Sequence, residues 1–469
     1  MKQTLLLCFC LWMFSATQAQ DSTFTLSENQ FLRMVQLYHP VARQARIGVE
    51  QREAEKLRAR GAFDPVLNAN QGAKTLTNTE YYRYQAWELD IPTWYGITVE
   101  AGQEKYNGDR LSNERTEGSL SYAGISFSVL QNLILDKRRA YLKQAGILIK
   151  QSEAEQQQML NDLLYDALQQ YWQWAQAYAE WQVVLDGVKN AEQRFNFTRR
   201  QVIIGERAAI DSVEALTQWQ FFQQQALEAD MKREQARWQL SVYLWLTNQE
   251  PYILPEQTQP LWPTTTPSQT IDTLSDQENY IQAVLNLHPE LNAYQQKLQY
   301  LQVSRQLAFQ SLLPKLDLQY RFLNKSMPDV LSNALPLLNN NFQYGVKFNM
   351  PLRLSEGRAD MRLTALKQEQ TRLDIYNKQN TLINKVRFNY IGVQQLAKQW
   401  EIQTQLLSNH QRLQSGEEIR FQQGESSLFL VNSREQKTLE SRQKLVALRA
   451  KFFKQKAGLL WSAGLLPIQ

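Results

Sequence analysis

The sequence predicts an α+β membrane protein in which long coiled-coil helices continue into an antiparallel transmembrane β-barrel. Three observations lead to this fold class: an internal repeat, two helical stretches of more than sixty residues, and short strands of alternating polarity before each of them. No segment after the N-terminus has the roughly 18 to 20 apolar residues that a membrane-spanning helix needs. Because strands that cross a membrane need only about ten alternating residues, the mean hydropathy of −0.50 is compatible with a barrel.

The N-terminus has the three-part layout of a secretory signal peptide. A basic residue precedes the apolar stretch Leu5–Phe14, and small and polar residues follow up to Ala19. This pattern predicts that residues 1–19 are a signal peptide and are removed. The only cysteines, Cys8 and Cys10, lie inside it. The exported chain would therefore lack disulfides, thiolate metal sites and a cysteine nucleophile.

An internal repeat organises the rest of the chain. His39-Pro40 recurs 249 residues later as His288-Pro289, and Pro65 recurs at the same offset as Pro314. Further on the offset is 219 and holds without a gap over more than a hundred residues, as in Arg139/Arg358, Asn161/Asn380, Tyr171/Tyr390, Trp181/Trp400, Gly205/Gly424 and Leu240/Leu459. A gapless match of this length indicates duplication. The first copy carries 30 additional residues in its strand region.

The repeat predicts the organisation of the chain. The first copy extends over residues 20–246 and the second over 277–469, and five prolines in the linker 247–276 exclude a continuous helix there. Each copy contains only thin elements. We therefore expect one interdigitated domain instead of two globular ones.

Each copy contains a helix that is too long for a globular domain. Residues 137–204 hold no proline and two glycines, and at 1.5 Å per residue they would extend roughly 100 Å. The second copy has the equivalent stretch 356–421, and shorter helices are expected near 28–61, 208–247, 277–311 and 427–463. The coiled-coil seam of the first long helix is Leu160, Leu164, Ala167, Tyr171, Trp174, Tyr178, Trp181, Leu185 and Val188.

Strand-like segments precede each long helix. They lie in a hairpin at 314–350 and in a hairpin region at 65–131. Apolar and polar residues alternate over Lys315–Phe322 and over Phe342–Met350, with aromatic residues on the apolar side. This pattern fits a barrel with lipid outside and water inside. A half-buried hairpin of a soluble protein is the alternative.

With two repeats, proline-led strands and strand-to-helix turns, the chain resembles the outer-membrane efflux protein family, of which TolC is a member. The strand-to-helix turns are Gln131-Asn132 in the first copy and Met350-Pro351 in the second. The helix-tip turn of the family, a Gly followed about six residues later by an Asp, is present from Gly205 to Asp211. It occurs in weaker form from Gly424 to Leu430.

The resemblance implies a homotrimer in which each chain gives four strands to one 12-stranded barrel in the outer-membrane lipid. The helices would form a periplasmic tunnel that meets a periplasmic adaptor and an inner-membrane pump. The channel would be a passive conduit, and the resemblance leaves its cargo and its pump open. A periplasmic coiled-coil adaptor or scaffold without a barrel is the alternative function.

Some positions depart from the family pattern. Asn132 replaces the usual proline, which should leave that turn less rigid. The additional residues include the strand-like runs Tyr81–Ile91 and Ile97–Tyr106. They would form an extracellular excursion or an added hairpin that enlarges the barrel, and we favour the family count of four strands. In the second tip, Leu430 and Ser433 stand where the family has acids.

The candidate functional residues lie at the two helix tips, and they are Gly205, Arg207, Asp211, Glu214, Gly424, Glu425 and Ser426. In a trimer, Asp211 and Glu214 would form a cation-attracting ring that Arg207 latches by ion pairing. Alternatively, both acids stabilise a helix N-terminus. The two glycines permit tight turns, and by resemblance an adaptor would contact them.

Catalysis and nucleic-acid binding have little support in the sequence. The net charge of +5 is mild and its basic residues are interspersed with acids, which does not indicate a nucleic-acid partner. Two of the three histidines, His39 and His288, precede prolines and fit helix starts. With no organised catalytic or metal-ligand spacing, the chain is predicted not to be an enzyme and to bind no metal or cofactor.

Overall fold

The computed structural model of the chain describes residues 24–112, 115–264, 266–272, 274–325, 341–350 and 352–466. The signal peptide expected at 1–19 lies outside these residues. Among the described helices, none combines the length and the apolar character needed to cross a membrane.

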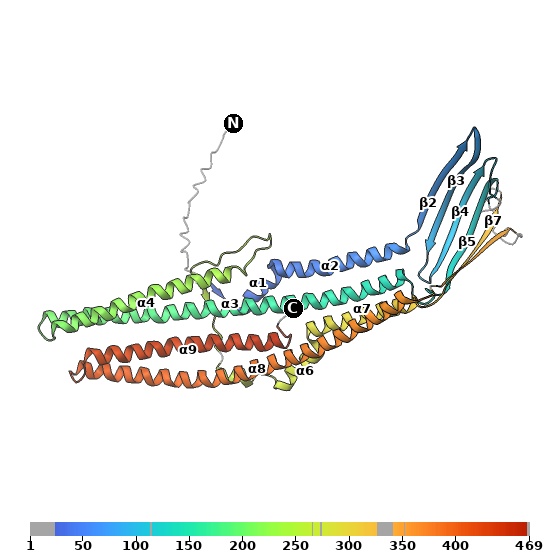
Figure 1. The fold of residues 1–469 in the computed structure, drawn as a ribbon. Coiled ribbons are helices and arrows are strands. Elements are labelled where there is room, and N and C mark those ends of the chain that lie inside the picture. The colour runs from blue at the N-terminus through green and yellow to red at the C-terminus, as the bar shows by residue number, and fades with distance from the viewer. Residues whose placement is uncertain are drawn as a thin grey trace, which may run out of the picture. The chain divides into compact units, whose positions relative to one another are not determined.

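The same order of elements occurs twice along the chain (Figure 1). The first series is α1 (Glu28–Tyr38), α2 (Pro40–Arg60), β2 (Val66–Leu76), β5 (Gly118–Leu130), α3 (Lys137–Ile203) and α4 (Ala209–Ser241). The second series is α6 (Gln277–Leu287), α7 (Pro289–Gln310), β7 (Lys315–Asn324), β8 (Phe342–Asn349), α8 (Ser355–Gln422) and α9 (Leu428–Ser462). The long helices α3 and α8 have 67 and 68 residues. The first series also contains η1 (Gly61–Phe63), β3 (Thr79–Pro92) and β4 (Ile97–Asn107).

The described chain forms two compact units. The first contains the described residues within 24–38, 167–272 and 396–454, and the second contains those within 39–166, 274–395 and 455–466. In the first unit, β1 (Thr25–Leu26) pairs with β6 (Gln259–Pro260) in parallel, and the linker contains the short helix α5 (Pro267–Asp272). The second unit holds the large sheet.

The two His-Pro pairs begin helices as expected. The Nδ1 atom of His39 accepts a hydrogen bond from the Val41 N–H group (3.2 Å), and that of His288 accepts one from the Glu290 N–H group (3.3 Å). Each proline occupies the first turn, where its missing N–H group costs no hydrogen bond. The imidazoles therefore act as N-caps in neutral form.

We expect the free energy of unfolding to decrease as the pH is lowered, because of the second of these caps. His288 is 2% exposed, and burial lowers its pKa to about 4, which Lys378 and Lys385 favour and Glu290 and Asp162 oppose. Between pH 6.5 and about 4 the unfolded chain binds a proton at this imidazole and the folded chain does not. The contribution of neutral His288 to the free energy of unfolding is therefore complete above pH 6.5 and decreases by up to about 3 kcal/mol as pH falls to about 4. The measurement is the midpoint of unfolding at pH 7 and pH 5. It should fall more between these two values in the wild type than in His288→Asn. An equal pH dependence in both proteins would refute this role.

The core of the first unit is aromatic. The Tyr171 hydroxyl donates to the carbonyl oxygens of Leu26 (2.9 Å) and Leu261 (3.2 Å), and so fixes α3 to the segments around β1 and β6. Beside it, the Trp172 ring stacks on Phe453 of α9 with centroids 4.4 Å apart. Buried aromatic pairs of this kind contribute about 0.5–1.5 kcal/mol beyond the area they bury.

The predicted seam of α3 is confirmed in part. Its positions from Leu160 to Tyr178 are buried, but Leu185 is 39% exposed while Val184 is 1% exposed. The prediction is wrong at Leu185 because α4 and α9 approach another face of α3 there. An added Cβ at Gly187 would lie 3.2 Å from Leu439 and 3.4 Å from Phe222, so the glycine permits this close packing.

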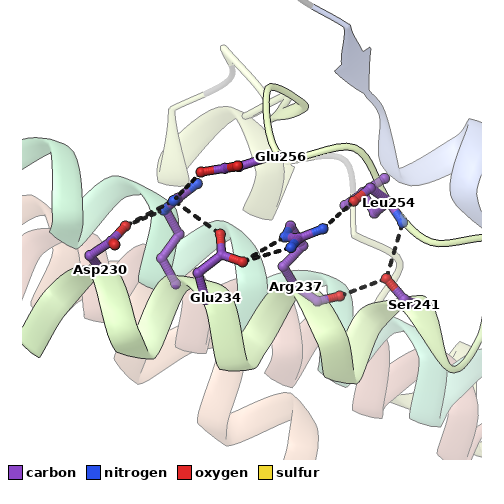
Figure 2. A network of polar contacts seen from close by, with 7 residues as sticks. Asp230, Glu234, Arg237, Ser241, Leu254 and Glu256 are labelled. Carbon is purple, nitrogen blue, oxygen red and sulfur yellow. Dashed lines mark hydrogen bonds and ion pairs between the residues drawn. The ribbon is translucent and has the colours of Figure 1, made fainter.

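A polar network attaches the linker to α4 in the first unit (Figure 2). The Arg237 guanidinium donates to Glu234 and to the Leu254 carbonyl oxygen, and the Leu254 N–H group donates to the Ser241 hydroxyl (3.1 Å). Arg233 is 6% exposed and forms ion pairs with Asp230, Glu234 and Glu256. These contacts order a proline-rich segment that cannot order itself by helix formation.

The strands form one antiparallel sheet of six strands in the order β2-β3-β4-β5-β7-β8. The strands expected near 81–91, 97–106, 315–322 and 342–350 are present as β3, β4, β7 and β8. The favoured count was four barrel strands for each chain, and this sheet has six strands. The two additional strands belong to the sheet because their backbones are paired on both sides. Strands β3 and β4 pair with each other, and they pair with β2 and β5 along most of their length.

The sheet has one apolar and one polar face, as the alternation predicted. Laterally paired residues share a face, and one such row contains Ile91, Val99, Ile125, Tyr320 and Tyr344. The next row lies on the other face and contains Asp90, Glu100, Gly124, Arg321 and Gln343. The apolar side chains are exposed, with Tyr344 70% and Val346 62% exposed. None of the described residues therefore covers this face fully.

Candidate functional site at the helix tips

Both helix tips contain the same glycine turn. Gly205 and Gly424 have φ values of +78° and +79°, and the next residues close the turns: the N–H of Glu206 donates to the Gln201 carbonyl oxygen and that of Glu425 to Arg420, both at 2.9 Å. A left-handed glycine after the last helical turn is a common way to end a helix. The geometric role predicted for both glycines is therefore confirmed.

The helices after the two turns begin differently. In the second tip, the Ser427 hydroxyl accepts a hydrogen bond from the Leu430 N–H group (3.4 Å), while the Ser426 hydroxyl donates to Glu417 (2.6 Å). In the first tip, Ala208 occupies the N-cap and offers no side-chain bond. Asp211 in the first turn of α4 therefore interacts with an uncapped helix N-terminus, where a carboxylate is favourable.

Arg207 connects the first tip to the end of α8. Its Nε donates to the Gln201 side chain (2.7 Å) and its Nη2 to the Phe421 carbonyl oxygen (3.4 Å). The guanidinium carbon lies 3.9 Å from the centre of the Phe421 ring, and Nη1 lies 3.8 Å from an Asp211 carboxylate oxygen. The structure thus brings Arg207 and Asp211 together, within one chain.

Glu214 faces α9 and belongs to a second polar network. Its Oε1 accepts a hydrogen bond from the side-chain amide of Asn432 (3.2 Å), and the Oδ1 atom of Asn432 accepts one from Arg194 of α3 (2.8 Å). Arg194 also forms a bidentate ion pair with Glu435 at 2.8 and 2.6 Å. Arg194 is 14% exposed and Glu435 is 5% exposed. The network joins three helices just behind the tips.

Sequence reasoning missed four residues of this region: Arg194, Glu417, Asn432 and Glu435. Glu417 is only 9% exposed and lies near Arg420 and Arg434, at 3.9 and 3.8 Å. The sequence pattern that could have indicated them is the spacing of Asn432 and Glu435, which lie three residues apart on α9 and so share a face. Their partners come from α3 and α4, and contacts between distant helices leave no local pattern.

A groove lies between α4 and α9 next to the tips. It has a volume of about 390 Å³ and is lined by polar residues such as Gln218, Ser433 and Glu440, with Phe429 as an apolar contact. The side chains of Gly424's neighbours Glu425 and Ser426 are outside its lining. The groove is open, and its lining combines polar side chains with the aromatic ring of Phe429.

The strand-to-helix turns form a second site region in the other unit. The Gln131 N–H group donates to the Pro314 carbonyl oxygen (3.1 Å), and the Asn132 N–H group donates to the Gln310 side chain (3.1 Å). Asn132 has φ +70°, which a proline ring cannot adopt. Hydrogen bonds therefore supply the constraint that a proline supplies elsewhere. Met350 is 44% exposed, and Pro351 lies outside the described residues.

Within the described part of the chain, no group of three or more His, Cys, Asp or Glu side chains is placed to hold a metal ion.

Comparisons with known proteins agree with this architecture. The family model described as outer membrane efflux protein matches residues 280–464. No curated protein sequence matches the chain. The resemblance inferred from the repeats and turns is confirmed by the family match and by the structures below.

Several solved structures share the fold over 93% of this chain. They include the Campylobacter jejuni CmeC outer membrane channel (TM-score 0.62, 15% identity, 85% of that chain covered). The open Neisseria gonorrhoeae MtrE outer membrane channel has a TM-score of 0.63 at 13% identity with 88% of its chain covered. The outer membrane protein VceC of Vibrio cholerae has a TM-score of 0.62 at 12% identity with 96% covered.

Proposed function

We propose that the chain is one protomer of a homotrimeric outer-membrane efflux channel. The observation that carries the proposal is the junction of long helical hairpins with a sheet whose exposed face is apolar and whose other face is polar. The match to the outer membrane efflux protein model and the fold shared with outer membrane channels support the same role. A soluble adaptor would share the helices but does not account for this sheet.

The channel would act as the passive exit of a tripartite system. An inner-membrane pump would supply the energy, and a periplasmic adaptor would connect the pump to the helix tips. The groove of about 390 Å³ between α4 and α9 is the surface that we assign to a helix of the adaptor. The chain would thus bind its trimer partners, the adaptor and outer-membrane lipid, and it would perform no chemistry itself.

Reconstitution into planar lipid bilayers tests this function. The purified full chain should form discrete ion-conducting pores, because three polar sheet faces would enclose a water-filled passage. A preparation that remains folded without detergent and leaves bilayers non-conducting would contradict the proposal.

The tip acids provide a test of the gate. In a trimer, Asp211 and Glu214 would bring about six carboxylates to the tip region, with Glu214 held behind the tip by Asn432, and together they would attract cations. We expect Asp211→Ala/Glu214→Ala to lower the cation preference in bilayers and, because Arg207 loses an ion-pair partner, to raise the frequency of opening. The control is Glu228→Ala, which removes an acid of α4 that is 57% exposed and lies outside the tip residues. Unchanged conductance and selectivity in the double variant would exclude a ring.

A further inference from the structure

The hairpin formed by β3 and β4 occupies two inner positions of the six-stranded sheet. It lies between β2 and β5, the strands that correspond to β7 and β8 of the second series. The β4–β5 pairing extends without a break from Ile97–Phe127 to Lys105–Ser119. The hairpin is therefore an integral part of the sheet and not an appendage at its edge.

The inserted strands extend along the sheet as far as its helical end. Their connecting turn, Thr93 to Gly96, places the Trp94 ring on Phe63 of η1 with centroids 4.2 Å apart. Gly96 lies against Arg139 at the start of α3, where an added Cβ would be 2.9 Å from the guanidinium. An extracellular excursion would turn back before reaching the helices, so this placement disagrees with that alternative.

The apolar face continues across the inserted strands in the half next to their connecting turn, while Arg83, Gln85, Gln103 and Lys105 lie on the same face farther from it. Trp87 (55% exposed), Ile91 (36%) and Val99 (38%) lie on the same face as Ile125 (42%) and Tyr320 (37%). A large apolar side chain left in water is unfavourable relative to burial in an apolar environment. The face therefore needs an apolar cover, and its continuity with β5, β7 and β8 points to the same cover for all six strands, which is lipid.

The polar face also continues across the insert. The Arg321 guanidinium of β7 forms ion pairs with Glu88 of β3 (2.8 Å) and Glu100 of β4 (2.7 Å). The Asp90 carboxylate accepts a hydrogen bond from the Asn68 amide of β2 (3.1 Å). These contacts connect the inserted strands to β2 and, across β5, to β7 on the side that would face water.

The two sheet edges identify a second copy of this chain as the partner. Within the described residues, β2 and β8 each pair on one side only, and an unpaired strand edge is a template for another strand. Because all neighbours are antiparallel and six is an even number, β8 runs antiparallel to β2. The β8 strand of one copy can therefore pair with the β2 strand of the next in the same alternation.

We propose that the inserted hairpin forms part of the transmembrane wall, so that three copies close a barrel of eighteen strands. This inference rests on the proposed trimeric outer-membrane channel. Barrel diameter grows roughly linearly with strand number, so the barrel would be about 1.5 times as wide as one of twelve strands. Barrels of 16 to 18 strands enclose an aqueous channel, and the exit would accept correspondingly bulkier cargo.

The test is thiol labelling in native outer membranes, because both natural cysteines lie in the segment 1–19 that we expect to be removed. The matched variants are Ala86→Cys on the polar face of β3 and Ala101→Cys on the apolar face of β4. The reference is Ala123→Cys, which is paired with Ala101 on the apolar face of β5. The probe is a charged, membrane-impermeant methanethiosulfonate.

We expect Ala86→Cys to react and both apolar-face variants to stay protected. Reaction of Ala101→Cys while Ala123→Cys is protected would place the hairpin outside the wall and overturn this inference alone. Protection of Ala86→Cys would also overturn it. Reaction of Ala123→Cys would instead contradict the proposed function, because β5 would then be outside the membrane.

End-on electron cryomicroscopy of the purified wild-type channel provides a second measurement that needs no variant. Eighteen strands in the ring are the expected result. A ring of twelve strands with β3 and β4 outside it would overturn the inference.

Discussion

Replacing Arg194 with alanine is expected to destabilise the helix tips by about 3–5 kcal/mol, because it leaves a buried carboxylate without its partner. Glu435 is 5% exposed and accepts both of its charged hydrogen bonds from Arg194. The same guanidinium also donates to Asn432, which in turn donates to Glu214. Amide hydrogen exchange near the tips of α3, α4 and α9 should accelerate accordingly.

The chain offers a matched control on the same helices. Arg442 of α9 lies 3.7 Å from Asp186 of α3, but their side chains are 37% and 67% exposed. An exposed pair contributes roughly 0–1 kcal/mol, so Arg442→Ala should leave exchange nearly unchanged. The double variant Arg194→Leu/Glu435→Leu should recover most of the protection by removing both charges. Equal exchange in Arg194→Ala and Arg442→Ala would show that the buried pair does not stabilise the tips.

Replacing Ile125 with arginine is expected to prevent stable assembly in the membrane. Ile125 is 42% exposed and lies in a middle row of the apolar face, between Val99 and Tyr320. A basic residue at the midplane of the lipid face of a barrel costs about 2–4 kcal/mol, and a trimer would incur this cost three times. The yield of folded oligomer, measured by unheated gel electrophoresis of outer membranes, should therefore fall sharply.

The adjacent residue gives the control for this substitution. Ser126 points to the polar face, beside Thr98 and Gln319. Ser126→Arg introduces the same side chain one position away, and it should assemble at close to the wild-type yield because the charge would meet water. Loss of assembly in both variants, or in neither, would contradict the assignment of the two faces.

Local patterns predicted the elements of the fold and the tip turns. The alternation over Lys315–Phe322 and Phe342–Met350 predicted strands with unlike faces, and β7 and β8 have this property. The glycines at 205 and 424 predicted turns, because few other residues adopt positive φ. The alternation of polar and apolar residues and the backbone conformation at a glycine depend on residues that are near one another in the chain. Both can therefore be predicted from one sequence.

The partners of the tip residues could not be predicted in the same way. Arg207 interacts with Phe421 of α8, and Glu214 interacts with Asn432 of α9. These pairs are more than two hundred residues apart, and their contacts depend on how the helices pack. The pairing of the additional strands could not be predicted for a related reason. The runs at 81–91 and 97–106 indicated strands, but the alternation alone did not show that they pair with β2 and β5.

The central claim is that the apolar sheet face lies in outer-membrane lipid as part of a trimer. Its most direct test is fractionation of cells that express the full chain, followed by electrophoresis in dodecyl sulfate with and without heating. We predict that the protein is recovered from outer membranes as an SDS-resistant trimer that dissociates on heating. Recovery as a monomer that is soluble without detergent would contradict the account.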